Sequence, residues 1–158
     1  MQTQAKEKGH QEIDCEHLLL TLLDQEDSLV LSVLQKLGVQ VSGLKQALDR
    51  ILSQRAKVSG GGDQYLSQSL RKAFDKAESE TKQLKDEYTS TEHLLLGIVQ
   101  ESGSDLTNLF KREGVNRDNL LKALMELRGN HRVTDQNPED KFKALEKYFL
   151  KFLSVVYL

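Results

Sequence analysis

One nine-residue pattern occurs twice in this chain, and it constrains the possible folds more than any other feature. Residues 15–23 read Cys-Glu-His-Leu-Leu-Leu-Thr-Leu-Leu, and residues 91–99 read Thr-Glu-His-Leu-Leu-Leu-Gly-Ile-Val. The shift of 76 positions that superposes them also places Gly38-Val39 on Gly114-Val115 without a gap. Since the shift preserves residues typical of helix starts and helix stops, it predicts a duplicated structural unit.

The first copy contains signals for three helices. Asp14 is suited to cap a helix over roughly 15–24, and a second helix is expected over 28–37, ended by Gly38. Ser42 is suited to cap a third helix. The residues expected to face the core are Leu18, Leu19, Leu22, Leu23, Val30, Val33, Leu34, Leu37, Leu44, Leu48, Ile51 and Leu52.

The second copy contains one helix more at its front. A long helix is expected over 67–84, followed by helices that begin after Ser90 or Thr91, at 105–113, and after Asn116. The residues expected to face the core are Leu70, Ala73, Phe74, Ala77, Leu95, Leu120, Leu121, Leu124 and Leu127.

These signals predict an all-α fold with essentially no β-strand. We expect two tandem, pseudo-symmetric helical repeats over residues 1–53 and 65–129, joined by a glycine-rich linker at 54–64. Residues 130–158 are expected to form a linker followed by a helix that starts near Pro138. In this arrangement Leu19 and Leu95 are predicted to occupy equivalent buried positions.

Both ends of the sequence depart from the repeat pattern. The partner of Leu70 would precede Met1, so we expect the opening helix of the first copy to be incomplete. Residues 149–158 are mostly apolar and have no assigned partner within the repeats. We expect this tail either to fold back over the gap left by the missing opening helix or to promote self-association, although it is too short to span a membrane.

Composition narrows the possible partners. A net charge of −2 gives no basic face for nucleic acid, and no apolar signal segment is visible at the start. The single Cys15 cannot form an internal disulfide, which favours a reducing, cytoplasmic setting. Gly60, Gly61 and Gly62 lack the Gly-Lys-Ser/Thr of a phosphate loop, so we expect a linker and no bound cofactor there.

Each copy carries a Glu-His pair that has to be weighed as a metal or catalytic site. His17 and His93 are both followed by three leucines, so neither pair offers a second ligand one turn along the helix. A structural role at the helix start is therefore expected. His10 and His131 lie in polar segments expected to be turns. We expect no catalytic residue and no metal ligand, and Cys15 is expected only to pack near its helix cap.

The front of the second copy offers apolar side chains for binding. Tyr65, Leu70 and Phe74 lie on or beside its long helix. A groove between the two copies, with an acidic rim, would suit extended peptide segments. The alternative is that each of these residues belongs to the core.

The duplicated Thr/Cys-Glu-His-Leu-Leu-Leu unit, with a Gly-Val turn after each copy, resembles the amino-terminal Clp repeat domain of the AAA+ unfoldases. Three further segments resemble the ClpB group of bacterial disaggregases: Val-Ser-Gly-Gly at 58–61, Arg-Val-Thr-Asp-Gln-Asn-Pro-Glu-Asp-Lys at 132–141 and Ala-Leu-Glu-Lys-Tyr at 144–148. The resemblance implies a non-catalytic, all-helical substrate-recognition domain. ATP would bind only in ATPase modules that this sequence does not contain.

The resemblance also implies binding residues and partners. The family's substrate-contacting acids correspond to Asp86 and Glu92, and its groove position corresponds to Phe74, which adds to Tyr65 and Leu70 as candidate binding residues. The implied partners are unfolded or aggregated proteins and an Hsp70-type chaperone system, with no nucleic acid and no membrane. The parent protein would be a cytoplasmic homohexamer, and this chain alone a monomer.

Two other functions remain open. One is an adaptor-binding amino-terminal domain of a protease-associated Clp ATPase. The other, of a different class, is a small helical metalloenzyme that uses His17 and His93.

Overall fold

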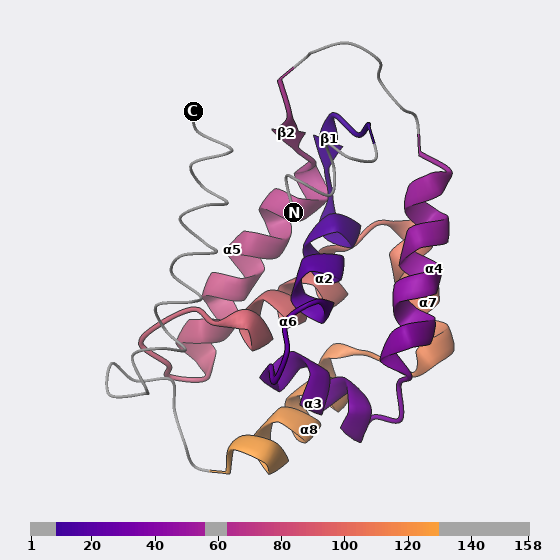
Figure 1. Ribbon diagram of the computed structural model, residues 1–158. Coiled ribbons are helices and arrows are strands. Elements are labelled where there is room, and N and C mark those ends of the chain that lie inside the picture. Colours follow the sequence, from indigo (N-terminus) through magenta and orange to yellow (C-terminus); the bar gives the residue numbers. More distant parts are fainter. Residues whose placement is uncertain (1–8, 56–62, 130–158) are drawn as a thin grey trace.

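The computed structural model describes residues 9–55 and 63–129, which form a helical domain with one small pair of strands (Figure 1). The predicted all-α architecture is confirmed in its main features. The elements are β1 (Glu12–Ile13), α2 (Cys15–Leu23), α3 (Leu29–Lys36), α4 (Val41–Ser53), β2 (Tyr65–Leu66), α5 (Gln68–Gln83), α6 (Thr91–Glu101), α7 (Ser104–Glu113) and α8 (Arg117–Arg128).

The helices follow the sequence repeat. The shift that relates His17 to His93 carries the start of α2 onto the start of α6 and the start of α4 onto the start of α8. The starts of α3 and α7 agree to within one residue. Leu19 and Leu95 are 0% and 2% exposed, so their predicted equivalent burial is confirmed.

Most helices start within one or two residues of the predicted positions. Side chains of Ser28, Ser67 and Asn116 accept hydrogen bonds from backbone N–H groups in the first turns of α3, α5 and α8. The predicted cap at Ser42 is wrong, because α4 begins at Val41 after Gln40, which makes no side-chain cap bond. Its start matches that of α8 under the repeat, so packing of the helix outweighs the local cap preference.

Helices α3 and α7 end in the same way. Gly38 and Gly114 have φ values of 81° and 69°, which a residue with a Cβ rarely adopts. The next residue then donates its N–H back across the last turn, Val39 to Leu34 O at 3.0 Å and Val115 to Phe110 O at 2.8 Å. Both helix stops predicted from the repeat are confirmed.

The strand pair corrects the expectation of essentially no β-structure. Glu12 pairs with Tyr65 and Ile13 with Leu66 in a parallel register, and Figure 1 shows the two strands side by side. Two residues per strand give no recognisable alternation, which is why the pattern did not predict them. The pairing joins the start of α2 to the start of α5, and hence the two repeats.

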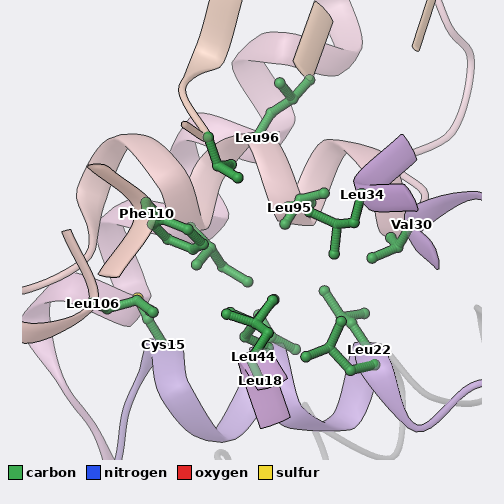
Figure 2. Close-up of a cluster of buried hydrophobic side chains, with 14 of the residues drawn as sticks. Cys15, Leu18, Leu22, Val30, Leu34, Leu44, Leu95, Leu96, Leu106 and Phe110 are labelled. Atoms are coloured by element: carbon green, nitrogen blue, oxygen red, sulfur yellow. The ribbon is translucent and has the colours of Figure 1, made fainter. Parts of the chain in front are cut away.

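A single hydrophobic core is shared by both repeats. Figure 2 shows Cys15, Leu18 and Leu22 of α2 in one cluster with side chains from α4, α6 and α7. The prediction that Leu127 faces the core is wrong, because this residue lies in the last turn of α8 and is 42% exposed. Four others expected inside are only partly buried: Leu37, Ile51, Phe74 and Leu121.

Helices α5 and α6 pack at unusually close range. A Cβ placed on Gly97 would lie 2.2 Å from the backbone oxygen of Ala73, so only glycine allows this approach. No helix within residues 9–55 and 63–129 is long and apolar enough to cross a membrane. The predictions for the segment before Gly9, for Gly60, Gly61 and Gly62, and for the tail at 149–158 lie outside the described residues.

Candidate functional site

The two Glu-His pairs are helix-start structures. In α2 the Nδ1 atom of His17 accepts a hydrogen bond from the backbone N–H of Asp14 at 3.0 Å, and Asp14 in turn caps the helix. In α6 the Nδ1 atom of His93 accepts from the backbone N–H of Ser90 at 2.8 Å. Each is a reciprocal capping box in which histidine takes the place usual for Glu or Gln.

Each histidine has a second partner on the other side of its ring. His17 Nε2 lies 2.9 Å from His10 Nδ1, and His93 Nε2 lies 2.6 Å from Asp86 Oδ2. The repeat shift also relates His10 to Asp86, so the two contacts are structural counterparts. His10 lies in the loop before β1, as expected, but its side chain is buried at 4% exposure and has His17 as a partner, which the sequence did not predict.

His17 and His93 therefore stabilise the fold through these hydrogen bonds. Among the residues that the structure describes, no three His, Cys, Asp or Glu side chains are grouped so as to hold a metal ion. Cys15 is fully buried at the start of α2, and burial raises the pKa of its thiol above the usual range. A thiol in this state is a poor nucleophile.

Asp86 lies inside the protein, in the predicted turn before α6. Its carboxylate accepts two hydrogen bonds from Arg128 at the end of α8, at 3.0 Å and 2.5 Å. The Asp86 side chain is 0% exposed and that of Arg128 is 8% exposed. The carboxylate thus joins the α5–α6 connection to the last turn of α8, and it does not reach the surface where a peptide would bind. Arg128 had no distinguishing signal in the sequence.

The five residues predicted to bind substrate do not share one surface. Leu70 is 0% exposed in the core, and Glu92 is buried at 7% in the first turn of α6. Tyr65 on β2 is 49% exposed, and Phe74 on α5 is partly buried against the core. Tyr65 on β2 and Phe74 on α5 are therefore the members of the predicted site that remain at least partly accessible.

A second polar cluster lies where the repeats meet. Asp14 Oδ1 accepts a hydrogen bond from Ser67 Oγ at 2.6 Å, and Asp14 Oδ2 accepts one from Arg55 at 2.8 Å. Burial alone would raise the pKa of Asp14, but the bonds from Ser67 and Arg55 hold it below its usual value. Arg55 also pairs with Glu16 at 2.8 Å, while burial and the nearby Asp14 raise the pKa of that carboxyl.

This cluster positions the edge of the candidate surface. Asp14 caps α2, while Ser67 caps α5 and donates to Asp14, so the starts of both helices share one carboxylate. Tyr65 lies two residues before Ser67 and is held at its backbone by Gln11 O at 3.0 Å. Sequence reasoning missed Arg55, because it placed that residue in the linker.

Comparison with known proteins agrees with this architecture. The family model of the Clp repeat (R) N-terminal domain matches residues 1–113. The chain is 41% identical over 151 residues to the chaperone protein ClpB of Bacillus anthracis, covering 93% of this chain and 17% of that protein. It is 42% identical over 147 residues to ClpB 1 of Synechococcus elongatus, covering 91% and 16%. The chain thus spans about a sixth of the length of these relatives.

Solved structures show the same fold. The Hsp104 N-terminal domain of Candida albicans aligns with a TM-score of 0.70 at 20% identity, covering 82% of this chain and 85% of that one. The N-domain of ClpV from Vibrio cholerae aligns with a TM-score of 0.67 at 25% identity, covering 79% and 76%. With its duplicated Glu-His helix starts and paired Gly-Val stops, the chain belongs to the Clp repeat N-terminal domain family.

Proposed function

We propose that this chain is the substrate-recognition domain of an ATP-dependent protein disaggregase, and that it binds unfolded or aggregated polypeptides without catalysing a reaction. The observation that carries the proposal is the 41% identity, across 93% of the chain, to a protein named as a ClpB chaperone. ATP hydrolysis, a hexameric parent, an Hsp70-type partner and a cytoplasmic location belong to the proposed whole protein.

The surface next to β2 is the proposed contact region. Tyr65 exposes about half of its side-chain surface, and its aromatic ring offers a large apolar contact at small entropic cost. Phe74 lies further along on α5 and is partly exposed. A flexible peptide loses conformational freedom when it binds a shallow surface, and it buries little area in return. We therefore expect micromolar or weaker affinity, which corresponds to a binding free energy of about 8 kcal/mol or less in magnitude.

Asp86 and Glu92 enter this proposal in a changed role. Both are buried, so we do not expect them to contact the ligand directly, and Asp86 supports the α5–α6 connection through its bonds to Arg128. A substitution at Asp86 is then expected to weaken folding and binding together. A substitution at Tyr65 is expected to weaken binding alone.

The test is binding of a fluorescently labelled, permanently unfolded model protein. The variants are Tyr65→Ser, Phe74→Ser and the matched control Met125→Ser, since Met125 on α8 is as exposed as Tyr65. We expect Tyr65→Ser and Phe74→Ser each to weaken binding about two- to tenfold, in keeping with the loss of one aromatic contact of roughly 0.5–1.5 kcal/mol. Met125→Ser is expected to bind like the unchanged protein.

Circular dichroism and thermal melting show whether each variant retains its fold. If all four folded proteins bind equally, the β2–α5 surface is not the site. If none of them, including the unchanged protein, binds the unfolded probe, the substrate-recognition proposal itself is refuted.

A further inference from the structure

An added proton on the buried pair formed by His10 and His17 would disrupt one of the pair's hydrogen bonds. The two rings lie edge to face, with centroids 5.1 Å apart and an interplanar angle of 73°, and their exposures are 4% and 0%. His17 Nδ1 accepts from the N–H of Asp14, so the hydrogen of the neutral ring is on Nε2. That hydrogen points to His10 Nδ1 at 2.9 Å, which must therefore be the acceptor.

Protonation of this pair breaks a hydrogen bond at either of the two nitrogens. A proton on His17 Nδ1 would face the N–H of Asp14 and remove half of the capping box. A proton on His10 Nδ1 would face the Nε2–H of His17 across the same short contact. Each arrangement sets two donors against each other in a buried place, which is costly.

The equivalent site in the second repeat gives its histidine different partners. His93 Nε2 faces a carboxylate, Asp86, in place of a second imidazole. Ser90 Oγ lies 2.9 Å from His93 Nδ1, which also accepts from the backbone N–H of Ser90. The two capping boxes therefore differ mainly at the outer ring nitrogen, which meets a second imidazole in the first repeat and a carboxylate in the second.

The His10–His17 pair lies under the junction between the repeats. His10 directly precedes Gln11, whose carbonyl accepts from the N–H of Tyr65 at 3.0 Å, and its own carbonyl accepts from Gln64 at 3.2 Å. The next bond of the junction joins Ser67 N–H to Ile13 O at 2.9 Å. Displacement of His10 from His17 would thus loosen the attachment of β1 to β2.

We propose that mild acid opens the β1–β2 junction at the start of the first repeat while the equivalent region of the second repeat stays closed. The surrounding charges are Glu12 on β1, Asp14 and Glu16 at the start of α2, and Arg55 after α4. Asp14 and Arg55 are paired at 2.8 Å, and Arg55 also holds Glu16, so both carboxylates are engaged by a cation. Asp14 favours a proton on His17, but burial, His10 and Arg55 outweigh it. This acid-induced opening of the junction does not depend on any peptide-binding role of the domain.

The size and sign of the effect follow from proton linkage. Burial lowers the pKa of His17 to about 4, and the neighbouring His10 and Arg55 act in the same direction. An opened junction returns this histidine to an ordinary pKa near 6.5, so the open form binds more protons and gains population as the pH falls between these values. At pH 5 the open population is expected to rise roughly 30-fold relative to pH 7.5.

Amide hydrogen exchange by NMR, corrected for the intrinsic pH dependence of exchange, measures this opening residue by residue. The protection factors of Tyr65 and Ser67 report the junction, and those of Asp86 and Leu94 report the second repeat. We expect the first pair to fall roughly 30-fold between pH 7.5 and pH 5, and the second pair to fall less than about threefold. An equal fall at all four amides would mean global destabilisation and would overturn the proposal, as would no fall at any of them.

Two variants identify the group that titrates. His17→Gln keeps an acceptor for the N–H of Asp14 without a titrating ring, so protection at Tyr65 and Ser67 should become nearly independent of pH. His10→Asp gives His17 the carboxylate partner that His93 has, and it should also suppress the response. If either variant, folded at pH 7.5, keeps the full acid-induced loss, the histidine pair is not the trigger.

Discussion

Replacement of Gly97 by alanine tests the close packing of α5 on α6, the contact on which the second repeat depends. A Cβ at this position would lie 2.2 Å from Ala73 O, 3.1 Å from Ala73 C and 3.2 Å from Ala77 N. All three atoms belong to the backbone of α5, so no side-chain rotation can relieve the clash. The helix itself has to move by about 1 Å, since ordinary carbon contacts lie near 3.5 Å.

The expected cost combines two opposing terms. Overpacking a rigid contact costs about 1–3 kcal/mol, and a backbone clash this short belongs at the upper end of that range. Alanine recovers about 1 kcal/mol through its higher helix propensity. We therefore expect Gly97→Ala to lower the free energy of unfolding by roughly 2 kcal/mol.

The matched control is Gly43→Ala on the exposed side of α4. No atom lies within 4 Å of a Cβ placed on Gly43, so only the propensity term acts and the protein should gain up to about 1 kcal/mol. Urea unfolding followed by far-ultraviolet circular dichroism measures both variants. A Gly97→Ala protein as stable as the unchanged one would refute the reasoning, and so would an equal loss in Gly43→Ala.

Two further predictions concern a strained turn and a buried ion pair. Lys85 has a φ of 57°, and its counterpart in the first repeat is Gly9 with a φ of 74°. Lys85→Gly should therefore raise the free energy of unfolding by roughly 1 kcal/mol, measured by urea unfolding. A clear loss of stability would contradict the assigned strain. Arg128→Met removes the main cationic partner of a carboxylate that is fully buried, Asp86, and should cost about 3 kcal/mol. The control Lys82→Met, in a pair 75% and 64% exposed, should cost no more than about 0.5 kcal/mol, and equal costs for the two variants would show that burial of the pair does not matter.

The sequence predicted which residues lie in the candidate region better than it predicted whether their side chains are exposed. Tyr65 and Phe74 are predicted as apolar residues on or beside one helix, and the structure leaves both at least partly accessible. Asp86 and Glu92 are predicted through family resemblance, and the structure buries both. A carboxylate in a turn has the same local pattern whether it faces solvent or an arginine, so its exposure could not be inferred.

The sequence by itself determined the helices, their ends and their duplication. A cap such as Asn116 accepts a hydrogen bond from the backbone N–H of Asn119, three residues away, so the interactions that start a helix lie between neighbouring residues. Gly38 and Gly114 stop their helices for a reason that belongs to a single residue, the absence of a Cβ.

Only the tertiary structure decided which polar groups meet inside the protein. Asp86 and Arg128 are 42 positions apart, and Asp14 and Ser67 are 53 positions apart. The first pair depends on how α8 packs near the α5–α6 connection, and the second on how the starts of α2 and α5 meet, because a carboxylate is buried only where a distant partner is brought to it. The burial of His10 beside His17 and the pairing of β1 with β2 arise in the same way, from chain segments that no local pattern connects.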